Sequence, residues 1–176
     1  MTTITLKGHE ISIITIRDSF QRRAIQYQNN IIASLRKLGL TEDDVDVPLK
    51  MGLQKVQASA SWYLNGRYLY YSYAGSRFVE NLYVVSKVIE LEVNAVLNEE
   101  KNMAEFLAEF EEGHDLLAKR KEARELLGVA SDALDMDLIN QKYKLLAKEH
   151  HPDLGGDIET FKAINNAHKM LKRELQ

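Results

Sequence analysis

The sequence contains no cysteine, only two prolines and no long apolar run. Without cysteine the chain can form no disulfide, and a zinc site would need histidine and carboxylate ligands, which stand at no recognisable spacing. No apolar run approaches the ~20 residues that span a bilayer, and the N-terminus lacks a signal-peptide hydrophobic core. We therefore expect a protein with no membrane segment, no metal and a cytoplasmic location.

A strong net charge is also absent, because the 176 residues carry a formal charge of −3. Residues 119–176 hold 11 Lys+Arg against 10 Asp+Glu, and residues 1–118 hold 12 against 16. Such balances give no overall electrostatic footprint for nucleic acid or an anionic membrane. With 45% hydrophobic residues, the composition is that of a globular protein of one or two domains.

The tripeptide His151-Pro152-Asp153 lies between two amphipathic helical patterns. Before it, four residues recur at helical spacing: Ile139, Tyr143, Leu146 and His150. Asp135 or Asp137 is expected to cap this helix, and proline should end it at about His150. After it, Gly155-Gly156-Asp157 predicts a turn and a cap, and a second apolar stripe follows: Phe161, Ile164, Ala167, His168 and Leu171. Two antiparallel helices should thus display a short exposed loop.

This pattern resembles the J domain of DnaJ-type co-chaperones over residues ~119–174. The likeness is carried, in family order, by residues 123–129, 143–153 and 161–168. The aromatic residue usual near the start of the first helix is absent, and His168 stands where tyrosine is commoner. The resemblance implies an all-α J domain in which a helical hairpin displays the His-Pro-Asp loop. The zinc-binding repeats and Gly/Phe-rich linker of full-length DnaJ are missing.

The resemblance further implies that this loop docks on a DnaK-type seventy-kilodalton chaperone and stimulates its ATP hydrolysis. The implied docking residues are His151, Pro152, Asp153, Lys142, Lys144 and Lys148. Asp153 would offer a carboxylate to a partner arginine, and Pro152 would hold the shape of the loop. The lysines would meet an acidic surface and mainly raise the encounter rate, although a solvated helix face would carry lysines equally well.

A histidine beside an aspartate also suits general base catalysis, with Asp153 orienting His151. No nucleophile and no phosphate-binding glycine loop accompanies the pair. His150 lies on the apolar helix face, so it is read as a core-edge residue and not as a metal ligand. We therefore predict no catalytic residue, no cofactor and no enzyme activity.

Residues 1–113 are predicted to form an α+β domain of order ββαββα, in which helices cover one side of an antiparallel sheet. In order, the patterns indicate two short strands over residues 4–16, a helix over 20–39 capped by Asp18 or Ser19, a hairpin over 58–73, and helices over 77–98 and 103–112. Residues 41–48 should form a loop or a single turn. A linker at about 113–121 then leads into the J domain of residues 114–176.

The dipeptide Asn65-Gly66 lies between two aromatic-rich runs and is the strongest short-range signal for a hairpin. A two-residue loop places Leu64 opposite Arg67, on an apolar face. The other face carries tyrosine and serine: Tyr63, Tyr68, Tyr70, Ser59, Ser61 and Ser72. Such an amphipathic surface fits a client or partner protein, although tyrosine is also an ordinary strand residue whose hydroxyl meets water.

The same tyrosines could stack on nucleic-acid bases while four arginines contact phosphates: Arg17, Arg22, Arg23 and Arg67. The negative balance of this half argues against nucleic acid as a partner. The alternative for the whole chain is therefore a partner- or nucleic-acid-binding protein in which the J-like helices are only a structural appendage. His9 and His114 stand alone in the sequence and are read as ordinary polar residues.

Overall fold

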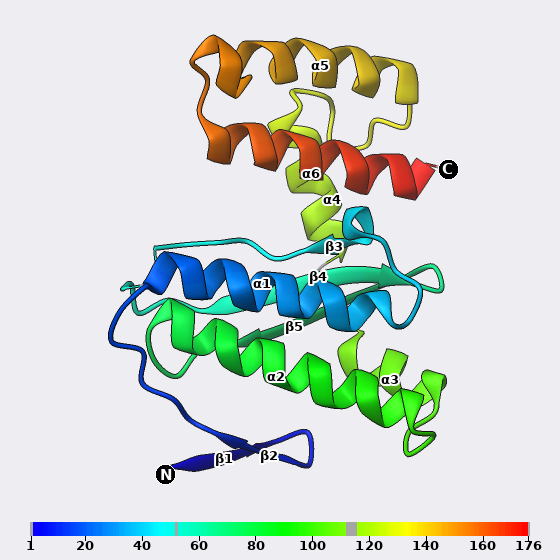
Figure 1. Cartoon of the computed structure of the whole chain (residues 1–176). Coiled ribbons are helices and arrows are strands. Elements are labelled where there is room, and N and C mark those ends of the chain that lie inside the picture. The colour runs from blue at the N-terminus through cyan, green and yellow to red at the C-terminus, as the bar shows by residue number, and fades with distance from the viewer. Residues whose placement is uncertain (1, 52, 112–115, 176) are drawn as a thin grey trace. The chain divides into compact units, whose positions relative to one another are not determined.

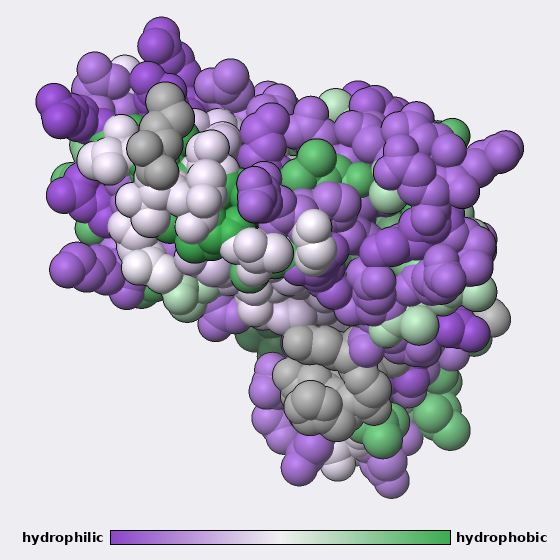
Figure 2. All heavy atoms as spheres, turned by 90° about the horizontal axis from the view of Figure 1, so that it is seen from below, coloured by the Kyte–Doolittle hydropathy of each residue, from purple (hydrophilic) through white to green (hydrophobic). Residues whose placement is uncertain are grey.

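The computed structural model describes residues 2–51, 53–111 and 116–175 (Figure 1). The chain divides into two compact units, residues 1–112 and 113–176. The first unit is α+β and the second is all-α, as the sequence predicted. Among the described residues, no helix is long and apolar enough to span a membrane. Hydrophilic side chains cover most of the face in Figure 2, where hydrophobic ones gather only in small groups.

The first unit begins with a small hairpin of strands β1 (Thr3–Leu6) and β2 (His9–Ser12), which pair antiparallel. Lys7 and Gly8 make the turn between the two strands, both with positive φ (49° and 81°). This hairpin is a sheet of its own, separate from the second sheet of the unit. The unit therefore has two antiparallel sheets where the sequence predicted one.

Helix α1 (Phe20–Arg36) follows, but its two ends differ from the prediction. The cap expected from Asp18 or Ser19 is wrong, because Ser19 stands at the N-cap with φ 54° and its side chain makes no cap hydrogen bond. The helix also ends three residues before Gly39. From there, backbone amides bond to carbonyls three residues back, and this tighter turn runs to Gly39 at φ 90°.

The second sheet contains three antiparallel strands in the order β3-β4-β5. They are β3 (Val45–Asp46), β4 (Ala58–Leu64) and β5 (Arg67–Tyr73). The turn at Asn65-Gly66 has φ values of 52° and 75°, and the predicted register is confirmed from Leu64 opposite Arg67 to Ala58 opposite Tyr73. A single 3-10 turn, η1 (Glu42–Asp44), precedes β3, whose two residues are too few for a periodic signal.

Helices α2 (Phe78–Leu97) and α3 (Met103–Phe110) complete the first unit. Figure 1 shows α1 and α2 side by side across the sheet. The fully buried Trp62 of β4 anchors the core, with its ring centroid 6.4 Å from that of Phe106 and 5.1 Å from that of Phe110. The helices thus cover the apolar face of the hairpin. Helix α3 ends two residues before the predicted end at residue 112, because Glu111 is extended and forms a β-bridge with Leu69 of β5.

Asn81, in the first turn of α2, is a buried polar side chain whose hydrogen bonds are satisfied. Its Oδ1 accepts from the amides of Gly75 (3.0 Å) and Ser76 (2.8 Å), and its Nδ2 donates to the carbonyl of Val56 (2.9 Å). One amide group therefore holds the two segments that flank the β4-β5 hairpin against the start of α2.

The second unit consists of α4 (Leu116–Leu126), α5 (Met136–Glu149), the 3-10 turn η2 (Pro152–Leu154) and α6 (Ile158–Leu175). Its buried core is small: Ala123, Leu127, Ile139, Ile164, Ala167 and Leu171. Asp135 caps α5 as predicted, accepting from the Asp137 amide at 3.0 Å, and His150 is the C-terminal cap. Asp157 accepts from the Thr160 amide at 2.8 Å in the first turn of α6.

Arg124 of α4 is almost fully buried and contacts both other parts of the second unit. Its Nε donates to the carbonyl of Ala133 (2.8 Å) in the connection to α5. Its Nη2 lies 2.8 Å from Oε2 of Glu174 in α6. A buried guanidinium is tolerated here because a carboxylate and a carbonyl replace the lost water.

Candidate functional site

The His-Pro-Asp loop joins α5 to α6 and is closed by its own backbone. Pro152 occupies the first position of the 3-10 turn, where its fixed φ suits the turn and its missing N–H loses no bond. The carbonyl of His151 accepts from the amides of Leu154 (2.9 Å) and Gly156 (3.0 Å). Two hydrogen bonds on one carbonyl give the loop a defined shape.

The side chains of His151 and Asp153 lie in different environments. The Asp153 amide donates to Nδ1 of His151 at 3.1 Å, and the histidine ring meets the Phe161 ring edge-on at 5.1 Å. His151 therefore stabilises the loop. The carboxylate of Asp153 is 89% exposed and lies 3.7 Å from Nδ1 of His151, beyond hydrogen-bond reach. Because a backbone amide already occupies Nδ1, Asp153 does not orient His151 as a catalytic base.

The predicted docking lysines are all solvent-exposed on α5: Lys142, Lys144 and Lys148. Ile139 of the same helix is fully buried, so the lysines lie away from the core. Sequence reasoning passed over Leu145, an exposed apolar residue beside Lys144 that falls outside the apolar spacing of the helix. Within the described ranges no three His, Cys, Asp or Glu side chains gather into a possible metal site.

Polar and aromatic side chains of α5 and α6 also contact each other directly. The Tyr143 hydroxyl donates to Oδ1 of Asn165 at 2.8 Å, and its ring stacks on His168 at 3.9 Å between centroids. Nε2 of His168 lies 2.7 Å from Oδ1 of Asn140. Burial, and then the charge of Lys172, lower the pKa of His168. His168, which stands where tyrosine is commoner in the family, thus contributes to the interface between α5 and α6.

The predicted tyrosine face is present on the β4-β5 hairpin, opposite the face that carries Trp62. Tyr63, Tyr68 and Tyr70 are each partly buried. The rings of Tyr63 and Tyr68 meet at 5.2 Å, and Gln57 donates to the Tyr70 hydroxyl at 3.3 Å. The structure therefore brings these three side chains to one surface.

The arginines proposed as phosphate contacts are not gathered on that surface. Arg67 belongs to the opposite face of the hairpin, and its Nη1 lies 3.0 Å from Oε2 of Glu111. Arg17, Arg22 and Arg23 belong to α1 and the segment before it, and α1 lies in the helix layer (Figure 1). The geometry therefore gives the nucleic-acid alternative no support.

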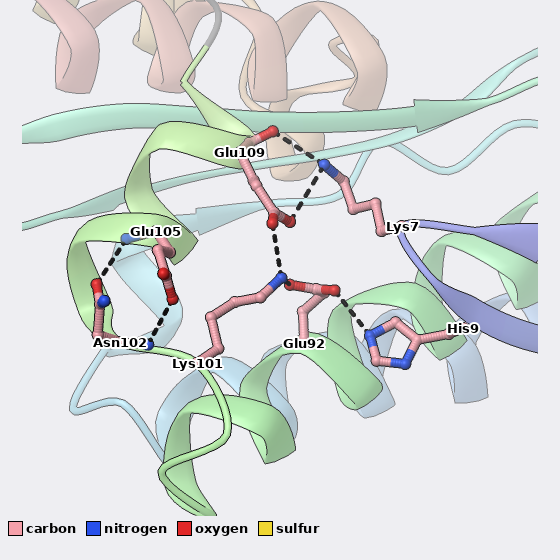
Figure 3. Close-up of polar contacts among 7 residues, drawn as sticks. All are labelled: Lys7, His9, Glu92, Lys101, Asn102, Glu105 and Glu109. Carbon is pink, nitrogen blue, oxygen red and sulfur yellow. Dashed lines mark hydrogen bonds and ion pairs between the residues drawn. The ribbon is translucent and has the colours of Figure 1, made fainter.

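A second polar site, which sequence reasoning missed, lies beneath the β1-β2 hairpin. Figure 3 shows Lys7 and His9 pointing toward carboxylates of α2 and α3. His9 Nε2 lies 2.7 Å from Glu92, whose side chain is 0% exposed, and Lys101 joins Glu92 to Glu109. Lys7 Nζ donates to the Glu109 carbonyl at 3.0 Å. Reading His9 as a residue that stands alone was wrong; His114 lies outside the described residues.

The carboxylates and Lys101 form mutually stabilised ion pairs. Burial alone would lower the pKa of Lys101, but hydrogen bonds to Glu109 and Glu92 outweigh it and raise that pKa. Burial likewise would raise the pKa of Glu109, yet Lys101 and then Lys7 hold it below its ordinary value. The cluster thus fastens the N-terminal hairpin to α2 and α3. The feature of the sequence that indicates this cluster is Glu92, a charged residue three positions after Ile89 on the buried face of α2.

Comparison with known proteins assigns the second unit. Residues 124–176 match the family described as DnaJ domain. A Chaperone protein DnaJ of Trichormus variabilis is 48% identical over 50 residues, which is 27% of this chain and 13% of that relative's length. No solved structure matches the chain, and the family match includes no residue before Arg124. Residues 124–176, which make up most of the second unit, are therefore a DnaJ domain, the module of the J-domain co-chaperones.

Proposed function

We propose that the chain is a co-chaperone whose His-Pro-Asp loop binds a DnaK-type seventy-kilodalton chaperone and stimulates its ATP hydrolysis. The observation that carries this proposal is the 89% exposed carboxylate of Asp153 on a loop closed by its own hydrogen bonds. A carboxylate held in this way can pair bidentately with an arginine and so orient the partner. The DnaJ domain breaks no bond itself, because its effect is on the ATPase of the partner.

The exposed lysines of α5 would raise the rate of association with the chaperone more than they would stabilise the final complex. Lys142, Lys144 and Lys148 lie on the helix that leads into the loop. Solvent-exposed charges raise association rates when the partner surface is acidic, and salt weakens this effect. We expect substitution of the lysines to slow association, whereas changes in the loop should abolish stimulation.

The partner must share a compartment with the chain, and a cysteine-free sequence suits the cytoplasm.

The decisive experiment measures single-turnover ATP hydrolysis by a DnaK-type chaperone with and without the full chain. Asp153→Asn removes one charge at constant size, so we expect the stimulation to be lost while the far-ultraviolet circular dichroism stays unchanged. Glu159→Gln is the matched control, since Glu159 is also an exposed carboxylate and precedes the first buried residue of α6. Full stimulation by Asp153→Asn would contradict the proposed mechanism.

For the first unit, we propose that the tyrosine face binds a client or partner protein. Tyr63, Tyr68 and Tyr70 combine apolar rings with hydroxyls, which suits adaptable protein contacts. Replacing Tyr68 and Tyr70 by serine should weaken suppression of luciferase aggregation, measured by light scattering after dilution from denaturant. Stimulation of the chaperone ATPase should remain. Suppression equal to that of the unaltered chain would exclude this face as the client site.

A further inference from the structure

Gly156 passes the end of α5 so closely that no side chain fits between them. A Cβ atom on Gly156 would lie 2.2 Å from both the carbonyl carbon and the carbonyl oxygen of His150, and 2.6 Å from its Cα. These obstacles are backbone atoms, which cannot rotate aside as a side chain can. Since carbon contacts are favourable only from ~3.5 Å, any other residue here would separate the two segments by roughly 1 Å.

Both of these segments support the His-Pro-Asp loop. His150 directly precedes the loop, and the Gly156 amide donates to the His151 carbonyl at 3.0 Å. The next residue begins the capped first turn of α6, where Phe161 holds the His151 ring at 5.1 Å. A shift between His150 and Gly156 would therefore move the loop and its histidine contact together.

We infer that Gly156 is a positioning residue, whose lack of a Cβ fixes the direction in which Asp153 is presented. This inference rests on the proposed docking of the loop on a DnaK-type chaperone. Gly155 provides a contrast within the same turn, because its φ is 81° but a Cβ there would meet nothing within 4 Å. Gly155 serves the left-handed backbone of the turn, whereas Gly156 serves the close approach of two segments.

The test compares Gly156→Ala with Gly155→Asn in the full chain, by titrating each into the single-turnover ATPase assay. A displacement near 1 Å at a site that orients a partner costs on the order of 10- to 100-fold in rate, so we expect Gly156→Ala to lose that much maximal stimulation. The half-saturating concentration should change less than about threefold, because the lysines of α5 are untouched. Gly155→Asn, whose Cβ meets nothing within 4 Å and whose side chain is among those that tolerate positive φ, should retain most of the stimulation.

Three results would overturn the inference while the proposed function stands. These are full stimulation by Gly156→Ala, a rise in the half-saturating concentration with maximal stimulation unchanged, and a loss of maximal stimulation in Gly155→Asn equal to that in Gly156→Ala. If Gly156→Ala fails to fold, insertion of one glycine between Gly155 and Gly156 gives the second test. That insertion adds no Cβ but relaxes the close approach, so it should reduce maximal stimulation, and full stimulation would refute the inference. Absence of stimulation by the unaltered chain would instead contradict the proposed function.

Discussion

The buried carboxylate of Glu92 allows a quantitative test of what holds the first unit together. Glu92 lies on α2 with its side chain 0% exposed, between His9 of the N-terminal hairpin and Lys101 of the loop before α3. Glu92→Gln keeps the size of the side chain and removes its charge. The change therefore isolates the electrostatic contribution from packing.

The expected loss follows from the partners that remain. Removing one member of a buried ion pair costs about 3–5 kcal/mol when the other member is left uncompensated. Here Lys101 keeps Glu109 at 2.8 Å and its side chain is 17% exposed, so part of its charge stays balanced. Glutamine can still accept a hydrogen bond with its amide oxygen. We expect Glu92→Gln to lower the free energy of unfolding of the first unit by roughly 2–3 kcal/mol.

Tryptophan fluorescence during urea unfolding measures this loss, because Trp62 is the only tryptophan of the chain and is fully buried in the first unit. Glu90→Gln is the matched control on the same helix. Glu90 pairs with Lys87 at 2.7 Å, but both side chains are well exposed, so the control should change stability by less than about 1 kcal/mol. Equal midpoints for the two variants would refute the view that the buried cluster stabilises the unit.

Two further predictions concern other buried polar groups. Burial, followed by the charge of Lys172, lowers the pKa of His168, so the unfolded chain takes up the proton more readily. The DnaJ domain should be fully stable above the ordinary histidine pKa of 6.5, and its stability should fall as the pH drops through the folded pKa of His168. Hydrogen exchange of α5 and α6 at several pH values measures this loss. The variant His168→Phe should remove the pH dependence. Asn81→Ala leaves buried amides and a carbonyl without partners, so it should cost about 2–4 kcal/mol in the same Trp62 assay.

Features determined by neighbouring residues could be predicted from the sequence. Asn65-Gly66 fixed the register of the β4-β5 hairpin, because a two-residue turn leaves a single pairing for the strands. Pro152 fixed the end of α5, because it has no amide for the helix and restricts the residue before it. The same local rules predicted that a loop would stand between α5 and α6.

Features determined by distant residues could not be predicted in this way. His9 and Glu92 are 83 positions apart, and no periodic pattern links a strand residue to a particular helix residue at that separation. Strand β3 is too short for an alternating pattern and exists because β4 offers it a pairing edge. Ser19 matches the preferred composition of a helix cap, yet its backbone takes the left-handed conformation and its side chain makes no cap bond.

Two of the contacts that escaped prediction share one physical role, which is to hold loops in place through satisfied buried polar groups. Asn81 holds the two segments beside the hairpin, and Arg124 holds the connection between α4 and α5. Left unpaired, each such group would cost more than one hydrogen bond contributes, so the native arrangement is favoured strongly over slightly displaced ones. The His151 carbonyl, which accepts hydrogen bonds from two amides, holds the His-Pro-Asp loop in a similar way. Asp153 can then be both exposed and well oriented, because its direction depends on backbone bonds that do not involve its own side chain.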